Sequence, residues 1–259
     1  MAWALVTGAS VGLGAEFARQ IAAGGRNVVL VSRDAERLGT VARELEALGV
    51  EAEVVVADLA KRADVARVAR RIASEERPVD LLVNNAGFGF RHGFLEATEA
   101  ELDDALDVMV RAVMILSQAA ARAMVRRGSG TILNVSSIAA VLVTGTYSAH
   151  KAWVSAFTEA LAGDLYGTGV TATAVCPGLV RTKFHERAAL DLTALPRAVW
   201  LDAPTVVTSA LRAARRRRVF VTPTVRYGVI MAVARILPRR WVRRASRSGS
   251  GRKANRPST

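Results

Sequence analysis

Short apolar runs alternate with segments of helically spaced apolar residues through about the first 180 residues of the chain. The runs are rich in Val, Leu and Ile and predict buried strands at Trp3–Val6, Val28–Ser32, Val54–Ala57, Leu81–Asn84, Thr131–Val135 and Val170–Val175. The intervening segments carry apolar residues at three- and four-residue spacing, which predicts helices at Gly14–Ala23, Ala35–Leu48, Ala63–Arg77, Thr98–Arg127 and Tyr147–Leu165.

Strands and helices that alternate in this way predict an α/β fold. Because crossovers between parallel strands are right-handed, we expect a single Rossmann-like doubly wound parallel sheet with helices on both faces. This domain is expected over residues 1–222, with a cofactor half at 1–135 and a catalytic and substrate half at 136–222. Within it, the pattern weakens from Arg181 to about Asp202, as in a mobile segment, and Arg218–Thr222 is the last predicted strand.

The end of the chain differs from the rest in composition. Residues 223–245 predict an apolar and basic helical extension, and the Ser-, Gly- and Arg-rich residues 246–259 predict a disordered basic tail. The formal net charge of the chain is +13, yet the last acidic residue is Asp202 and residues 203–259 carry 15 Arg or Lys. Residues 1–202 hold 21 bases and 23 acids, a net charge of −2, so we do not expect the chain to bind nucleic acid.

The apolar stretch that begins at Tyr227 is too short to span a bilayer, which needs about 20 residues. With Trp241 and the clustered Arg it resembles a segment that makes peripheral contact with an anionic membrane. A helix that packs on the domain or on a partner subunit explains the same pattern, and the sequence leaves both interpretations open.

Composition and cysteine use indicate an ordinary intracellular protein. The chain has 259 residues, of which 51% are hydrophobic and 23% charged, and Cys176 is its one cysteine. A single cysteine forms no internal disulfide, and the N-terminus lacks a secretion signal, so a cytoplasmic location is expected. His92, His150 and His185 share no metal-ligand spacing, and we therefore predict no metal.

The first predicted strand runs into a glycine-rich loop and then a helix. The loop contains Gly8, Ser10, Gly12, Leu13 and Gly14. Glycines allow the backbone to approach a pyrophosphate, whose charge is stabilised by free N–H groups at the helix N-terminus. The position between strand and helix favours a dinucleotide site over a glycine-rich turn without ligand.

The choice of cofactor depends on the end of the second strand. An acidic residue about 20 positions after the glycines is typical of NAD binding. Here Ser32 and Arg33 occupy that place, 19 positions past Gly14 in the case of Arg33, and a guanidinium suits the 2′-phosphate of NADP. Asp34 follows directly and also suits a helix cap. We predict NADP(H) in preference to NAD(H).

A tyrosine and a lysine lie one helical turn apart in Tyr147-Ser148-Ala149-His150-Lys151, and Ser136 and Ser137 close the preceding strand. An ammonium near a phenol favours the phenolate and is expected to bring the tyrosine pKa down towards working pH. The pair therefore predicts proton transfer to a carbonyl oxygen as a nicotinamide delivers hydride.

Together these motifs resemble the short-chain dehydrogenase/reductase family across residues 2 to about 182. The matching segments are TGASVGLG, Asp58-Leu59 after the third strand, Asn84-Asn85-Ala86-Gly87, NVSS, YSAHK and PGLVRT at 177–182. The resemblance implies that Tyr147 is the general acid in reduction and the base in oxidation. Lys151 would bind the nicotinamide ribose and lower the tyrosine pKa, and Ser137 would bind the substrate oxygen.

The resemblance also implies the remaining cofactor contacts and an assembly. Asp58 and Asn85 are expected near the adenine, and Thr182 near the nicotinamide carboxamide. The other residues that it places at the cofactor are Leu59, Ala86, Gly87, Pro177, Gly178 and Val180. Family members also lead us to expect a homodimer or homotetramer.

The motifs predict an NADP(H)-dependent carbonyl reductase, a ketoreductase that interconverts a carbonyl and an alcohol. Phe88, Phe90 and Phe94, with Phe184, Leu190, Leu192, Leu195 and Trp200, suit an apolar pocket for a lipid-like, acyl or polyketide-type substrate, or ordinary packing. Two alternatives are a dinucleotide-binding protein with weak or no redox activity and a non-redox enzyme on the same fold.

Two departures from the family pattern concern proton delivery. Met109 stands where the family usually has an Asn, and Ser137 and Tyr147 are 10 residues apart rather than the usual 13. A thioether donates no hydrogen bond. We predict that Met109→Asn raises kcat at saturating substrate, whereas an unchanged or lower rate would show that Met109 does not limit turnover.

Overall fold

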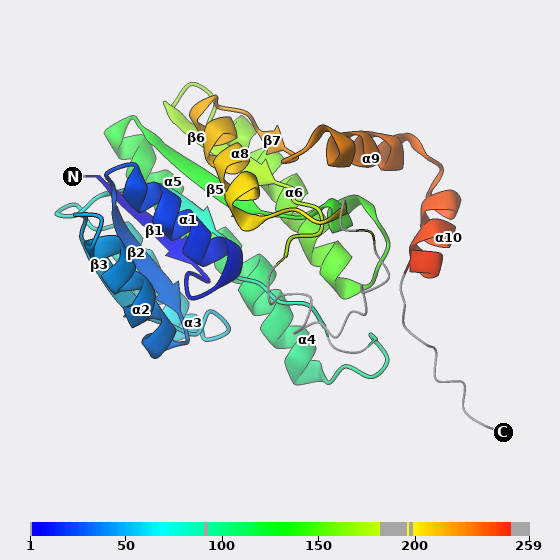
Figure 1. The fold of residues 1–259 in the computed structure, drawn as a ribbon, viewed down its shortest axis with the longest axis horizontal. Helices are drawn as coiled ribbons and strands as arrows, with labels where there is room; N and C mark the ends of the chain where they lie inside the picture. The colour runs from blue at the N-terminus through cyan, green and yellow to red at the C-terminus, as the bar shows by residue number, and fades with distance from the viewer. Residues whose placement is uncertain (1, 91–92, 182–195, 197–198, 250–259) are drawn as a thin grey trace.

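Seven parallel strands form one sheet in the order β3-β2-β1-β4-β5-β6-β7, in a computed structural model that describes residues 2–90, 93–181, 196 and 199–249 (Figure 1). The strands are β1 (Trp3–Thr7), β2 (Asn27–Ser32), β3 (Ala52–Val56), β4 (Val79–Asn84), β5 (Gly130–Val135), β6 (Val170–Val175) and β7 (Phe220–Val221). This arrangement confirms the predicted doubly wound sheet. The strand order reverses between β1 and β4, the place where such sheets bind dinucleotides.

The helices cover both faces of this sheet. They are α1 (Gly12–Ala23), α2 (Ala35–Glu46), α3 (Arg62–Ile72), α4 (Glu99–Leu106), α5 (Ala112–Arg127), α6 (Thr146–Asp164), α8 (Ala203–Arg215), α9 (Val225–Ile236) and α10 (Arg239–Gly249). In Figure 1, α1, α2 and α8 lie in front of the sheet, and α3 and α5 lie behind it. Two short segments complete the described part, a π-helical turn at Asp107–Arg111 and a 3-10 turn at Ile138–Val141.

The alternation of side chains along each strand divides the core in two. Ala4 and Val6 belong to the cluster that α1, α2 and α8 cover, whereas Trp3 and Leu5 belong to the cluster under α3 and α5. Because both faces are buried, β1 reads as a continuous apolar run rather than as an alternating one. Because all the strands are parallel, their carboxyl ends lie at the same edge of the sheet, and the candidate site lies at that edge.

The helix predicted over Thr98–Arg127 is present at Glu99–Arg127, but its α-helical hydrogen bonding is interrupted by a π-helical turn. Thr98 and Glu101 form a capping box that starts α4, but the π-helical turn at Asp107–Arg111 separates α4 from α5. An extra residue in a helical turn shifts the side chains that follow to a new face, and such turns are frequent at functional sites. Met109 lies in this turn and is fully buried.

Three other boundaries differ from the expectation. The predicted helix 63–77 ends at Ile72, because the chain must turn to begin β4 at Val79. The third strand is an edge strand rather than a buried one, with Val54 and Val56 38% and 43% exposed. Residues 246–249, predicted to be disordered, belong to α10, which continues to Gly249, and residues 250–259 lie outside the described residues. The stretch from Arg181 to about Asp202 lies largely outside the described residues.

By length and composition, the helical stretch Glu99–Arg127 could cross a membrane. Its inner side chains instead belong to the core: Leu116, Ala120 and Met124 are fully buried in the cluster that α3 and α5 form with the sheet. We therefore treat α5 as a core helix.

This assignment predicts different effects for two apolar residues of α5. Leu116→Ala should lower the free energy of unfolding by about 2–5 kcal/mol, because it removes buried methyl groups and leaves a cavity. Met114→Ala, at a side chain that is 41% exposed, should change it by less than about 0.5 kcal/mol. Urea unfolding of the two variants measures both values, and equal effects would contradict the core assignment.

Candidate active site

The loop after β1 has the backbone that a dinucleotide site requires. Gly8 and Gly12 adopt positive φ angles of 66° and 60°, which side-chain-bearing residues rarely adopt. Val11 at the N-cap of α1 offers no side-chain hydrogen bond to the helix, and its first turn contains no acidic residue. The N–H groups at this helix N-terminus are thus left to an external acceptor, and the loop fits the pyrophosphate of a dinucleotide.

Two loops are held together at this point. The Thr7 hydroxyl accepts hydrogen bonds from the backbone N–H groups of Asn85 and Ala86, at 3.0 and 3.1 Å. The Asn85 amide in turn donates to the carbonyl oxygens of Thr7 and Gly8, at 2.9 and 3.3 Å. A Cβ atom on Gly14 would lie 2.1 Å from the Gly8 oxygen, so only glycine permits the observed approach of α1 to the loop. Asn85 therefore fixes the shape of the glycine-rich loop, which we call the cofactor cradle.

The end of β2 leaves Arg33 and Asp34 in different situations. The Asp34 carboxylate caps α2 by accepting from the backbone N–H of Arg37 at 3.0 Å, and it also pairs with the Arg37 guanidinium at 3.3 Å. Arg33 is exposed and forms no ion pair with any carboxylate among the residues described. Ser32 accepts from the Asp34 N–H at 3.2 Å. The capping role predicted for Asp34 is confirmed.

Other residues that the sequence places at the cofactor occupy the same edge of the sheet. Asp58 follows β3, where its carboxylate accepts from the N–H of Ala60 at 3.2 Å, and Leu59 is buried. Ser10 and Leu13 belong to the glycine loop and the start of α1, and Pro177 follows β6 and accepts from the N–H of Ile138 at 3.0 Å. Thr182 lies outside the described residues.

The segment after β6 rests on a residue that sequence reasoning missed. A Cβ atom on Gly178 would lie 2.1 Å from the ring of Tyr227 in α9, so the backbone at this glycine packs directly on the aromatic ring. The Tyr227 hydroxyl accepts from the N–H of Leu179 at 3.3 Å and donates to the Val199 carbonyl. Tyr227 also shares an apolar cluster with Val180 and Leu13, which links this segment to the glycine loop.

The three predicted catalytic residues come together. The Ser137 side chain hydrogen-bonds to Tyr147 despite the shortened spacing, because the 3-10 turn at Ile138–Val141 folds the intervening chain back. The Lys151 ammonium lies 5.7 Å from the centre of the Tyr147 ring and donates to the Val135 carbonyl at 2.8 Å. The arrangement can hold a carbonyl oxygen between two hydroxyls and supply a proton to it.

Burial makes the Tyr147 phenol less acidic, which is the opposite of the expected change. It raises the pKa of Tyr147 well above its ordinary value, and the hydrogen bond from Ser137 only partly opposes this. The expectation that Lys151 brings the tyrosine pKa towards neutrality is wrong for this structure. The ammonium is itself buried, which lowers its pKa to about 8, and it is directed at a backbone carbonyl.

Met109 is part of the same neighbourhood. A Cβ atom built on Gly87 would lie 3.5 Å from both the Lys151 Nζ and the Met109 Sδ, so both side chains border the same point. His150 lies next to Lys151 in α6, its Nδ1 is buried without a hydrogen-bond partner, and its ring centre is 6.4 Å from that of Phe90. Burial, then the charge of Lys151, lowers the pKa of His150.

A buried polar ladder beneath the site was also missed by sequence reasoning. The Asn84 amide donates to the Asn134 side chain at 2.8 Å, and Asn134 donates to Thr158 at 3.0 Å. Ser136 donates to the Lys151 carbonyl oxygen at 2.7 Å, which ties β5 to α6. Asparagines within otherwise apolar strands were the available signal, because a buried amide needs partners.

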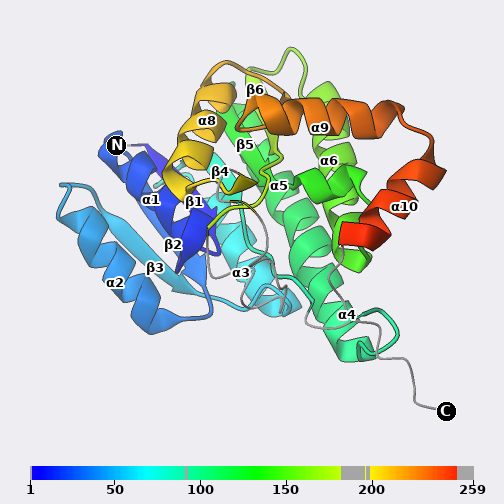
Figure 2. The same ribbon diagram turned by 45° about the vertical axis from the view of Figure 1, so that its right-hand side comes forward.

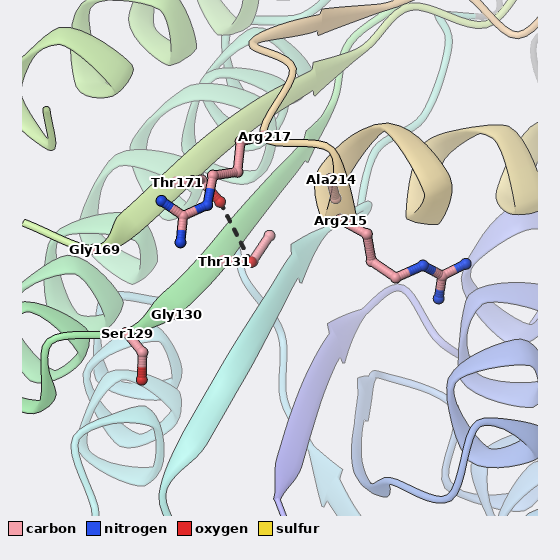
Figure 3. A pocket seen from close by; sticks show the side chains of 8 residues that line it. All are labelled: Ser129, Gly130, Thr131, Gly169, Thr171, Ala214, Arg215 and Arg217. Atoms are coloured by element: carbon pink, nitrogen blue, oxygen red, sulfur yellow. Dashed lines mark hydrogen bonds between the residues drawn. The ribbon is translucent and has the colours of Figure 1, made fainter.

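A separate hollow of about 220 Å³ lies at the other end of the strands (Figure 3). Thr131 and Thr171 hydrogen-bond to each other there at 3.3 Å, and Arg217 approaches them while Arg215 points away. The strands β5 and β6 begin at the hollow and end at the candidate site, so the hollow and the glycine loop lie at opposite edges of the sheet. We assign it no part in the chemistry.

The chain is similar to known proteins in sequence and in fold. A family model described as short chain dehydrogenase matches residues 2–192. Galactitol 2-dehydrogenase (L-tagatose-forming) of Cereibacter sphaeroides is 37% identical over 78% of this chain and 79% of its own. A 3-oxoacyl-acyl-carrier-protein reductase of Staphylococcus epidermidis is 35% identical over 73% and 79%. A short-chain dehydrogenase from Sphingobium yanoikuyae, solved in complex with NADPH, superimposes with a TM-score of 0.81 at 30% identity, covering 92% of this chain and 97% of its own.

The lowered pKa of Lys151 predicts a pH dependence of stability. The folded chain releases this proton near pH 8, whereas the unfolded chain holds it to the ordinary value of 10.5. At this group the unfolded state therefore binds more protons between these values, which raises the free energy of unfolding by about 2 kcal/mol from pH 7.5 to 9.5. Burial raises the pKa of the Cys176 thiol and acts in the opposite direction, so the rise is measured as the difference between wild type and a variant without the ammonium. Lys151→Met keeps the side-chain volume and should lose this rise. Parallel urea titrations of both proteins measure it, and identical pH profiles would contradict the buried ammonium.

Proposed function

The chain belongs to the short-chain dehydrogenase family, and from this premise we propose that it is an NADP(H)-dependent oxidoreductase that interconverts a carbonyl and an alcohol. The observation that carries the proposal is the hydrogen bond between Ser137 and Tyr147, with the Lys151 ammonium beside the tyrosine ring. A nicotinamide cofactor, when bound, supplies or accepts the hydride.

The side chains of this group have complementary roles in reduction. The Ser137 hydroxyl binds the substrate oxygen and orients it towards Tyr147. A tyrosine phenol is protonated at neutral pH, so Tyr147 acts as the general acid and gives its proton to that oxygen. The electron pair that stays on the phenolate is stabilised by Ser137 and, when charged, by Lys151. In oxidation the same proton moves in reverse.

The preference for NADP(H) over NAD(H) rests on the end of β2. Asp34 is the residue whose charge favours NAD, but its carboxylate already caps the N-terminus of α2 and pairs with the Arg37 guanidinium. Exposed Arg33 has no carboxylate partner among the described residues, and a guanidinium binds a 2′-phosphate through two parallel hydrogen bonds. The NADPH complex of the Sphingobium enzyme supports the same choice.

An apolar carbonyl compound suits the side chains next to the site. The rings of Phe88 and Phe90 are centred 6.4 Å apart, and Phe90 lies the same distance from His150, one residue from Lys151. The relatives act on a sugar alcohol and on an acyl chain by their names, so they support a small-molecule substrate but no single class. A cytoplasmic homodimer or homotetramer completes the proposal.

A second candidate is a dinucleotide-binding protein with weak redox activity. Met109, which donates no hydrogen bond, is buried beside Lys151, where the family usually has an Asn. Both candidate functions use the same cofactor site, but the binding protein would turn over substrate slowly or not at all.

Replacing the proposed acid separates the two candidates. With a panel of aliphatic ketones, Tyr147→Phe should lower NADPH oxidation by at least about 100-fold, because it removes the proton donor. Tyr166→Phe, at a residue that is 91% exposed, is the matched control and should leave the rate unchanged. A measurable wild-type rate that survives in Tyr147→Phe would contradict the proposed role, and wild-type inactivity across the panel would favour the binding protein.

A further inference from the structure

The C-terminal helices pack on the loop between the catalytic serine and tyrosine. Met231 and Ala234 of α9 share a buried cluster with Val141 and Cys176. These apolar contacts join the inner face of α9 to the domain. The extension is thus part of the folded body rather than a loose appendage.

Two hydrogen bonds attach the same extension to that loop. The Arg239 guanidinium donates to the Val141 carbonyl oxygen at 3.1 Å, and the Ser246 hydroxyl of α10 accepts from the backbone N–H of Val143 at 3.1 Å. The loop is short by the standard of the family, and α9 and α10 cover it. Both views show these helices on the side of the molecule opposite β3 (Figure 1, Figure 2).

The outward face of α9 is apolar and exposed. Residues 225, 229 and 233 repeat every fourth position and so share one face of the helix, which residue 236 extends by a further turn. Soluble proteins rarely expose so regular an apolar row without a partner. The row consists of Val225 (85% exposed), Val229 (56%), Val233 (49%) and Ile236 (85%), and we call it the α9 stripe; Leu237 (43%), which follows α9, and Trp241 (59%) in α10 are also exposed.

The part of the chain that contains the α9 stripe is strongly basic. Residues 203–259 contain 15 Arg or Lys and no acid. Arg240, Arg243 and Arg244 are exposed in α10, on either side of Trp241 in the sequence. An exposed apolar row, a tryptophan and many arginines are together the composition of helices that lie in the headgroup region of an anionic bilayer.

We propose that the α9 stripe and the arginines of α10 form a surface that docks on an anionic lipid bilayer. With 12 residues, α9 is about 18 Å long and does not span the hydrocarbon, so it would lie in the interface. A symmetric contact between two copies would bring the same arginines of both chains together, and their repulsion opposes that occupant. The surface is distinct from the cofactor site, and its occupancy does not depend on the proposed activity.

Co-sedimentation of the full chain with lipid vesicles tests this surface. Wild type should pellet at least fivefold more with vesicles of phosphatidylcholine and about 30 mol% phosphatidylglycerol than with phosphatidylcholine alone, and high salt should reduce the difference. Val229→Glu/Val233→Glu should lower pelleting at least fivefold. Val54→Glu/Val56→Glu on the exposed edge of β3 adds the same charge elsewhere and should leave it within twofold of wild type.

A second pair of variants tests the charges and guards against misfolding. Arg240→Gln/Arg243→Gln should lower pelleting with anionic vesicles, whereas Arg215→Gln/Arg216→Gln, at the end of α8, should have a much smaller effect. If Val229→Glu/Val233→Glu does not fold, Val225→Ser tests the same apolar row at a more exposed position.

Three results would overturn the proposal. Equal pelleting with both vesicle types would exclude anionic lipid as the partner. Equal pelleting of the stripe variant and its β3 control would show that the apolar row does not enter the bilayer. Sedimentation velocity provides the third: a wild-type oligomer that dissociates in Val229→Glu/Val233→Glu, with vesicle binding unchanged, would assign the stripe to contact between copies.

Discussion

The joining of the loops after β1 and β4 is the contact on which the rest of the site depends. These strands are neighbours only because the strand order reverses between them, and Thr7 and Asn85 fasten their loops with four hydrogen bonds. The resulting backbone leaves the N-terminus of α1 without a side-chain cap and gives Gly8 a conformation that favours glycine. Without this contact, the glycine loop would lack the fixed shape that binding a dinucleotide requires.

Most of the architecture could be predicted from the sequence because its signals are local. Each buried strand is an apolar run and each helix has its own spacing, so the order of elements follows, and parallel crossovers then allow few topologies. The pairing of Tyr147 with Lys151 is equally local, since it depends on one helical turn. What local pattern does not specify is solvation: the burial that raises the pKa of Tyr147 and lowers that of Lys151 comes from the whole fold around them.

The features that sequence reasoning missed are contacts between distant parts of the chain. Tyr227 supports Gly178 from 49 positions away in the numbering, and no residue near either one indicates the contact. The π-helical turn that holds Met109 interrupts an apolar spacing that looks continuous from Thr98 to Arg127. Such contacts connect the C-terminal helices, the segment after β6 and the short loop before Tyr147 into one wall beside the candidate site.

Thermal unfolding with saturating NADPH, NADH or no cofactor, for wild type and Arg33→Ala, tests the central claim that this cradle holds NADP(H). A cofactor present at 100 times its Kd adds about 2.7 kcal/mol to the free energy of unfolding. We predict a rise in Tm with NADPH that exceeds the rise with NADH in wild type, and loss of that difference in Arg33→Ala, while Arg43→Ala behaves as wild type. No rise with either cofactor would contradict the dinucleotide site itself, and an equal rise with both would contradict the role of Arg33.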